Sequence, residues 1–147
     1  MTAIYFNQSE ENLRKTLPLP WLSFCTDESS YAPEGIFLKS GAHPRAYGTY
    51  PRILGKYVRD EKLMTLQEAI RKMSALPAEN LRIERRGRLQ KGYFADIVVF
   101  DPDKVRDLAT YENPHRYATG IIHVDSKDYA AFRSMVVNAK WDMTFVE

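Results

Sequence analysis

The segment Trp21–Asp27, with the sequence WLSFCTD, is the stretch around which the chain is organised. It is a short apolar run that ends in a carboxylate, and this pattern is typical of a buried parallel strand that presents a side chain at its carboxyl end. Cys25, the single cysteine, cannot form an internal disulfide and is expected to be a small buried hydrophobic residue. The segment therefore predicts a parallel strand, residues 21–26, with Asp27 at its end.

The residues before this segment predict a helix. Asn7 is followed three residues later by Glu10, which is the spacing of a capping box, and the helix is expected to run through Leu17. Residues 4–6 are expected to be the end of a further strand. A strand end, a helix and the strand 21–26 together indicate an α/β fold with a parallel sheet.

Two helices are expected after a long loop, residues 28–49. Pro51 is a favourable first residue for one helix, and Ile53, Leu54, Tyr57 and Val58 have helical spacing. Thr65 and Glu68 form a capping box for the other, in which residues 66, 69, 70 and 73 are apolar at helical spacing. Pro77 is expected to stop that helix or to begin a short helical turn.

The pattern changes to β-structure from Ile83 onward. Strands are expected at Ile97–Phe100, Gly120–Val124 and Ser134–Val137, the last followed by a hairpin that returns through Val146. The helical and β parts therefore divide the chain at residues 82 and 83.

Composition narrows the classes of function. The 147 residues carry a formal charge of only +2, and the basic residues between Arg82 and Lys91 are interrupted by Glu84, so neither a nucleic-acid partner nor an anionic membrane is expected. No apolar stretch has the length of a bilayer span, and the first residues lack the basic leader of a signal peptide. We expect a cytoplasmic protein.

Several motifs resemble one enzyme family. The acid at Asp27 is followed by AHPRAYGTYPRILG at residues 42–55, by GYFADIVVFD at 92–101 and by DLATYENP at 107–114. In this order they are similar to the C-terminal portion of the zinc-dependent N-acyl-D-amino-acid deacylases, or D-aminoacylases, of the amidohydrolase superfamily. The stretch that contains His43-Pro44-Arg45 is the more specific signal, because the pattern at 92–101 is shared with dihydroorotases and hydantoinases.

The resemblance implies a fold and a reaction. The α/β fold would comprise the last βα units of a (β/α)8 amidohydrolase barrel, with the HPR loop and closing helices, in residues 1–82. Part of a small β-sandwich domain would follow in residues 83–147. The implied reaction is hydrolysis of the amide of a small-molecule N-acyl-D-amino acid by metal-activated water.

The resemblance also implies roles for two residues. Asp27 matches the catalytic aspartate that takes a proton from the water and passes it to the leaving amine. Arg45 matches the arginine that grips the substrate carboxylate as a bidentate pair. The alternatives are that Asp27 only caps a loop and that Arg45 only braces one. For His43 we expect a hydrogen bond that orders the loop rather than a metal-ligand role.

The zinc of the complete enzymes has no ligand set in this sequence. The three histidines, His43, His115 and His123, are widely spaced and form no H-x-H pair, and His123 with Asp125 is expected to be a solvated pair. We therefore expect a C-terminal fragment of a deacylase that is inactive alone, completed by self-association or by the missing N-terminal barrel portion. Two alternatives stay open: a fragment of another amidohydrolase, and a non-catalytic structural or binding remnant of the fold.

Overall fold

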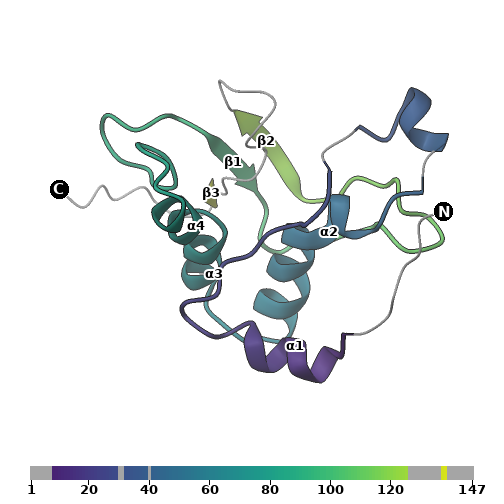
Figure 1. Cartoon of the computed structure of the whole chain (residues 1–147), viewed down its shortest axis with the longest axis horizontal. Coiled ribbons are helices and arrows are strands. Elements are labelled where there is room, and N and C mark those ends of the chain that lie inside the picture. Colours follow the sequence, from purple (N-terminus) through teal and green to yellow (C-terminus); the bar gives the residue numbers. More distant parts are fainter. Residues whose placement is uncertain (1–7, 30–31, 40, 126–136, 139–147) are drawn as a thin grey trace.

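The computed structural model describes residues 8–29, 32–39, 41–125 and 137–138 of the chain. Helices form the first part and a small sheet the second (Figure 1). In chain order the elements are α1 (Glu10–Thr16), the 3-10 helix η1 (Gly35–Lys39), α2 (Arg45–Arg52), the π-helix η2 (Ile53–Asp60), α3 (Leu66–Met73), α4 (Ala75–Asn80), β1 (Ile97–Phe100), β2 (Ile121–Asp125) and β3 (Val137–Asn138). None of the helices within these ranges has the length and apolarity needed to cross a membrane.

Strand β1 is the centre of the sheet. It pairs with β2 in antiparallel orientation and with β3 in parallel orientation, so the strand order is β2-β1-β3. Along β1 the buried residues alternate, with Val98 and Phe100 only 3% and 0% exposed. The strands expected at 97–100 and 120–124 are thus confirmed. Only the end of the third lies in β3, and the hairpin expected beyond it lies outside the described residues.

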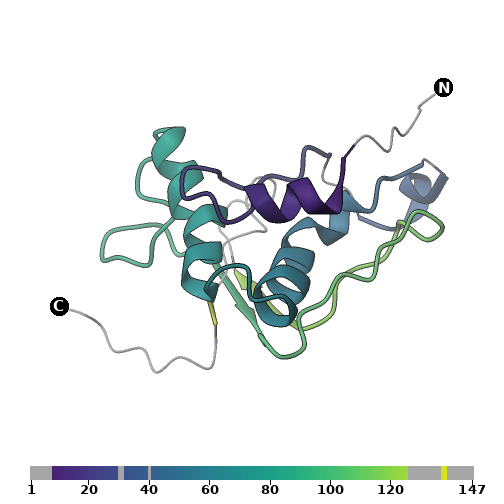
Figure 2. The same ribbon diagram turned by 90° about the horizontal axis from the view of Figure 1, so that it is seen from below.

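One hydrophobic core joins the sheet to the helices. Figure 1 shows β1 and β2 above the helices and α1 on the opposite, lower side, which faces the viewer in Figure 2. Arg14 of α1 is 2.7 Å from Glu61, and Lys56 of η2 is 2.9 Å from Glu10. These ion pairs hold α1 to η2. The buried core residues are Leu17, Phe24, Ile53, Leu54, Tyr57, Ala69, Met73, Val98, Phe100 and Val105. The division into domains at residues 82 and 83 stays a prediction.

The helix expected after Thr65 is confirmed as α3. The Thr65 hydroxyl accepts a hydrogen bond from the Glu68 amide at 3.2 Å, and Ala69 and Met73 are buried on the face toward the core. A break at Ser74 separates α3 from α4, which contains Pro77 and corresponds to the expected short helical turn.

Two helix starts were wrong. Helix α1 begins at Glu10 with Ser9 as its cap, because the Ser9 hydroxyl accepts from the Asn12 amide at 3.1 Å. Pro51 lies inside α2, which already begins at Arg45 in what was expected to be loop. Pro51 has no N–H to donate, and the wider π-helix η2 starts two residues later.

The segment Trp21–Asp27 forms no strand, so this prediction was also wrong. Its side chains nevertheless alternate as in a strand, with Phe24 6% exposed and Trp21 70% exposed. The Phe24 amide donates to the Lys72 carbonyl of α3 at 3.1 Å, but no β-ladder forms with other described residues. The pattern thus sets which side packs on the helices, while a strand also requires neighbouring strands.

Candidate active site

Asp27 ends the segment Trp21–Asp27 in a turn. Its φ of 49° lies in the left-handed region, which an aspartate tolerates better than most residues. The Thr26 hydroxyl supports the turn by accepting from the Glu28 amide at 3.4 Å. The Asp27 side chain is 83% exposed, so the turn presents its carboxylate on the surface.

Arg45 is the first residue of α2. Pro44 occupies the cap position and supplies no side-chain hydrogen bond, so the first amides of the helix need another acceptor. His43 Nδ1 accepts from the Arg45 amide at 3.1 Å. The expected loop-ordering hydrogen bond of His43 is therefore confirmed.

The structure brings Asp27 and Arg45 together. Arg45 Nη2 is 3.3 Å from Asp27 Oδ2, and Arg45 Nε is 3.4 Å from an oxygen of Glu28. Arg45 Nε is buried, and it has no hydrogen-bond partner among the described residues. A buried donor without an acceptor is costly, so this nitrogen favours an added anionic acceptor.

Glu28 is a member of the site that the sequence did not single out. Its side chain is only 22% exposed, compared with 83% for Asp27, and it approaches the same guanidinium. The available signal was its position directly after Asp27, which makes an acidic pair at the start of a loop. The two acids and Arg45 together carry one net negative charge.

The surroundings of His43 favour its neutral form. Burial lowers its pKa below the ordinary value of 6.5, the positive charge of Arg45 lowers it further, and Glu28 opposes them. Because a backbone N–H can only donate, Nδ1 must carry the lone pair and Nε2 the proton. Nε2 lies 3.4 Å from the hydroxyl of Tyr111, which comes from the loop after β1.

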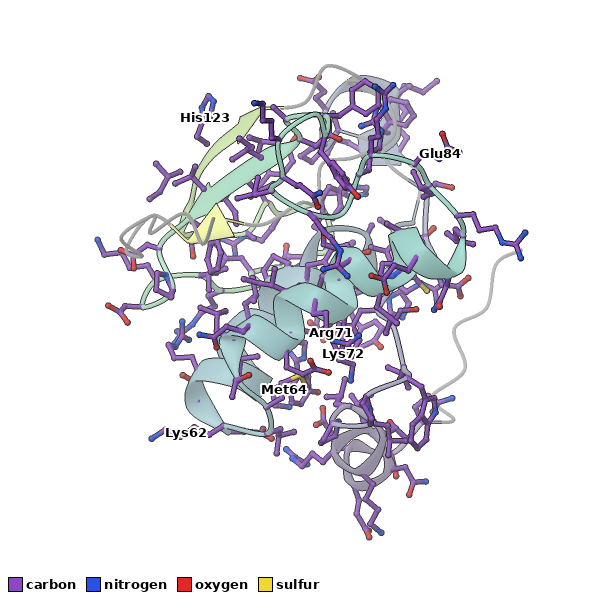
Figure 3. All side chains as sticks on the ribbon, turned by 90° about the vertical axis from the view of Figure 1, so that its left-hand side faces the viewer. Lys62, Met64, Arg71, Lys72, Glu84 and His123 are labelled. Atoms are coloured by element: carbon purple, nitrogen blue, oxygen red, sulfur yellow. The ribbon has the colours of Figure 1, made fainter. Side chains whose placement is uncertain are left out.

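Other residues from the sequence analysis lie outside this group. Cys25 is exposed, which corrects the expected burial: it lies on the side of the alternating segment opposite to Phe24. His123 is exposed on β2, and Figure 3 shows it at the outer edge of the sheet, away from the helices. The Asp125 side chain lies outside the described part of the structure, so the expected solvated pair with His123 stays a prediction.

Metal binding does not fit the residues that the structure describes. Across residues 8–29, 32–39, 41–125 and 137–138, no group of three histidine, cysteine or acidic side chains could hold an ion. Asp27, Glu28 and His43 lie near one another, but Arg45 takes both carboxylates and His43 Nδ1 is occupied by the Arg45 amide. Within this group only the Arg45 guanidinium is a cation that could bind an anion.

Comparisons with known proteins agree with the motifs. The model of the Amidohydrolase family matches residues 40–136. A D-aminoacylase from Alcaligenes xylosoxydans xylosoxydans is 41% identical over 81% of this chain and 23% of its own length. An N-acyl-D-glutamate deacylase from the same organism is 39% identical over 88% of this chain and 25% of its own length.

Solved structures agree with these relatives. The N-acyl-D-glutamate deacylase of Bordetella bronchiseptica, solved with zinc and a phosphonate inhibitor that mimics the tetrahedral intermediate, superposes with a TM-score of 0.74. It is 38% identical, over 83% of this chain and 24% of that chain. A D-aminoacylase crystal structure gives a TM-score of 0.56 at 49% identity, over 57% of this chain and 18% of that one.

The chain spans about a quarter of the length of the curated relatives that it matches, with 23% and 25% for the two above. The similarity to D-aminoacylases stated from the motifs is confirmed by these relatives. The family and the structural neighbours imply a TIM-barrel-type amidohydrolase fold. The chain belongs to the amidohydrolase family.

Proposed function

We propose that this chain supplies the Asp27–Arg45 part of a site that hydrolyses the amide of N-acyl-D-amino acids. The observation that carries the proposal is the contact of 3.3 Å between the acid at the end of Trp21–Asp27 and the arginine of the HPR tripeptide. The two residues lie 18 positions apart in the sequence, and the fold brings their side chains into contact. The deacylase relatives support the reaction class.

In this proposal Arg45 binds the substrate carboxylate. Its guanidinium presents Nε and Nη2 along one edge, which matches the two oxygens of a carboxylate. Nε forms no hydrogen bond within the described part of the chain, although a Glu28 oxygen lies 3.4 Å away, and Nη2 contacts a largely exposed Asp27. An ion pair with an exposed partner is worth little, so a substrate carboxylate displaces Asp27 at small cost.

Asp27 is the proton carrier of the proposed reaction. Once it is released from Arg45, its carboxylate takes a proton from the attacking water and returns it to the leaving amine. Substrate binding at Arg45 therefore frees the acid that the reaction uses. The described residues offer no group of ligands for the metal of the zinc-containing relative.

We also propose which part of the amidohydrolase fold this chain forms. Residues 1–82 would form the last βα units of the barrel, and residues 83–147 part of a β-sandwich. Trp21, 70% exposed, lies on the uncovered side of the strand-like segment, and the extended pattern there supports a place for neighbouring strands. Self-association or a barrel portion corresponding to the rest of the relatives would supply them, and a cytoplasmic location stays a prediction.

A chimera tests the proposed function. This chain replaces the corresponding C-terminal region of the Alcaligenes D-aminoacylase, and release of amino acid is measured with N-acetyl-D- and N-acetyl-L-amino acids. The proposal expects hydrolysis of the D substrates. A folded chimera that carries metal but hydrolyses no N-acyl-D-amino acid would overturn it.

A further inference from the structure

The loop after β1 lies against the turn that carries Arg45, and it makes two histidine–tyrosine contacts with that turn. His43 contacts Tyr111 with ring centroids 5.2 Å apart and an interplanar angle of 82°. The Tyr47 hydroxyl is 3.3 Å from His115 Nδ1. In both pairs the partners are 68 residues apart, and the two pairs are separated by four residues along each segment. We call His43, Tyr47, Tyr111 and His115 the His–Tyr clasp.

The same segment is fixed to α2 below the clasp. Asp107 is 2.9 Å from Arg52, and a Cβ at Gly48 would lie only 3.2 Å from the Asp107 Cβ. Gly48 is buried, so the lack of a side chain there allows the two segments to approach. The loop after β1 therefore lies along α2 from Arg52 toward His43.

We propose that the His–Tyr clasp positions Arg45 for the substrate carboxylate, which makes Tyr111 and His115 positioning residues of the site. Arg45 lies between His43 and Tyr47, so the two pairs hold the chain on both sides of it. His43 also accepts the Arg45 amide directly. This inference rests on the proposed role of Arg45 in carboxylate binding.

The clasp is sensitive to pH through His43. Protonation puts a hydrogen on Nδ1, where it faces the Arg45 amide hydrogen, and adds a cation beside the Arg45 guanidinium. The charged and titratable groups that face the ring are Arg45, Glu28 and the Tyr111 hydroxyl. Because the pKa of His43 is lowered in the folded chain, the clasp contributes fully to the free energy of unfolding above about pH 6.5. This contribution is lost as the pH falls through the pKa of His43 in the folded chain.

Nuclear magnetic resonance of the 147-residue chain tests the clasp without any turnover. Tyr111→Phe removes the hydroxyl that contacts His43 and keeps the ring. Tyr117→Phe is the matched control, because Tyr117 is 54% exposed compared with 49% for Tyr111 and contacts Tyr47 through its ring. We expect exchange of the Arg45 amide hydrogen to accelerate roughly three- to tenfold in Tyr111→Phe, the effect of losing one net hydrogen bond, and to stay unchanged in Tyr117→Phe.

Variants of His43 separate positioning from simple packing. In the wild-type chain the Arg45 amide and Nε signals should follow the His43 ring titration, with one midpoint below 6.5. His43→Asn keeps an acceptor two residues before the Arg45 amide, as in an Asx turn, and does not titrate. We expect it to retain the Arg45 amide protection and to abolish the pH response, whereas His43→Ala loses both.

The outcomes distinguish this inference from the proposed function. Equal exchange rates in Tyr111→Phe and Tyr117→Phe, or Arg45 signals that ignore the His43 titration, would overturn the clasp. Addition of N-acetyl-D-glutamate tests Arg45 separately in the same samples. If the ligand leaves the Arg45 signals unmoved while the clasp behaves as expected, the carboxylate role fails and the clasp stands as a structural device only.

Discussion

Arg45 is the residue whose chemistry is most specific at this site. A lysine at the same place would keep the charge but lose the paired donors of the guanidinium edge. The difference between arginine and lysine matters here because only arginine has an Nε. In Arg45 this atom is buried and lies 3.4 Å from a Glu28 oxygen. The site therefore needs the geometry of an arginine as well as its charge.

Arg45→Lys should weaken substrate binding in the active chimera. Loss of one charge-assisted hydrogen bond costs about 1.5–3 kcal/mol, which raises KM roughly ten- to hundredfold, with a smaller change in kcat. Arg52→Lys is the matched control, because Arg52 belongs to the same helix, is 45% exposed compared with 41%, and is paired with Asp107. Steady-state kinetics that show equal effects in both variants would remove the special role of Arg45.

The sequence predicted the central residues but not all their neighbours. Asp27 and Arg45 were chosen from motifs, and their contact at 3.3 Å agrees with that choice, although their catalytic and binding roles stay predictions. Glu28 and Tyr111 were not chosen, because their proximity to Arg45 and His43 depends on how distant loops pack. Cys25 was misplaced because an apolar neighbourhood in the sequence does not reveal which side of a segment is covered.

Helix α3 fixes the path of the chain toward Asp27. Lys72 is fully buried on α3 and donates to the carbonyls of Leu17 and Leu19, the latter at 2.8 Å. Its ammonium also lies 4.7 Å from the ring centre of Phe24. Figure 3 shows Arg71 and Lys72 on the side of α3 toward α1. The turn after α1 is thus held by cations of α3.

Lys72→Met should destabilise the chain in a pH-dependent way. The variant leaves two carbonyls without their donor, which costs about 1–3 kcal/mol in the free energy of unfolding at neutral pH. Burial lowers the pKa of Lys72 below 10.5, Arg71 lowers it further and Glu68 raises it. Between the folded value and 10.5 the unfolded chain binds more protons, so the wild-type free energy of unfolding rises with pH relative to the variant.

Urea denaturation of both proteins at pH values from neutral to alkaline measures this difference. Lys62→Met is the control, because Lys62 is exposed and Figure 3 shows it at the outer end of the turn before α3. A constant gap between the wild type and Lys72→Met across the alkaline range would contradict the buried ammonium.

Elements were predicted well where their signals are local. Helix α3 has a cap and an apolar period within its own residues, and both are confirmed. The start of α1 was wrong because two polar residues could cap it, and Ser9 does so. The strand at 21–26 failed for a different reason: ladder hydrogen bonds come from other strands, and a local sequence pattern cannot supply them.

At the scale of the whole molecule, the chain spans about a quarter of the length of the curated relatives that it matches. Its family could be predicted from motifs, and the relatives confirm it. The surroundings of the strand-like segment could not be predicted, because they depend on how distant segments pack rather than on the local pattern. In the proposed barrel, large exposed apolar side chains such as Trp21 and Ile36, 70% and 73% exposed, would lie on surfaces that neighbouring parts cover.

Metal content provides a prediction at this scale. The sequence contains three histidines and one cysteine, and the described residues offer no group of ligands. The purified chain should therefore retain no stoichiometric zinc after dialysis and show no deacylase turnover. Elemental analysis with the Alcaligenes D-aminoacylase as a positive control measures this, and one tightly bound zinc per chain would refute the prediction.

The most direct test of the account is the rate of the D-aminoacylase chimera with and without the Asp27 carboxylate. Asp27→Ala removes the proposed proton carrier, and loss of general acid–base catalysis lowers kcat by about 100- to 10,000-fold. The account predicts this loss with the zinc content of the chimera unchanged, because Asp27 belongs to no metal site among the described residues. Near-normal turnover in Asp27→Ala would contradict the assignment of Asp27 as the catalytic acid.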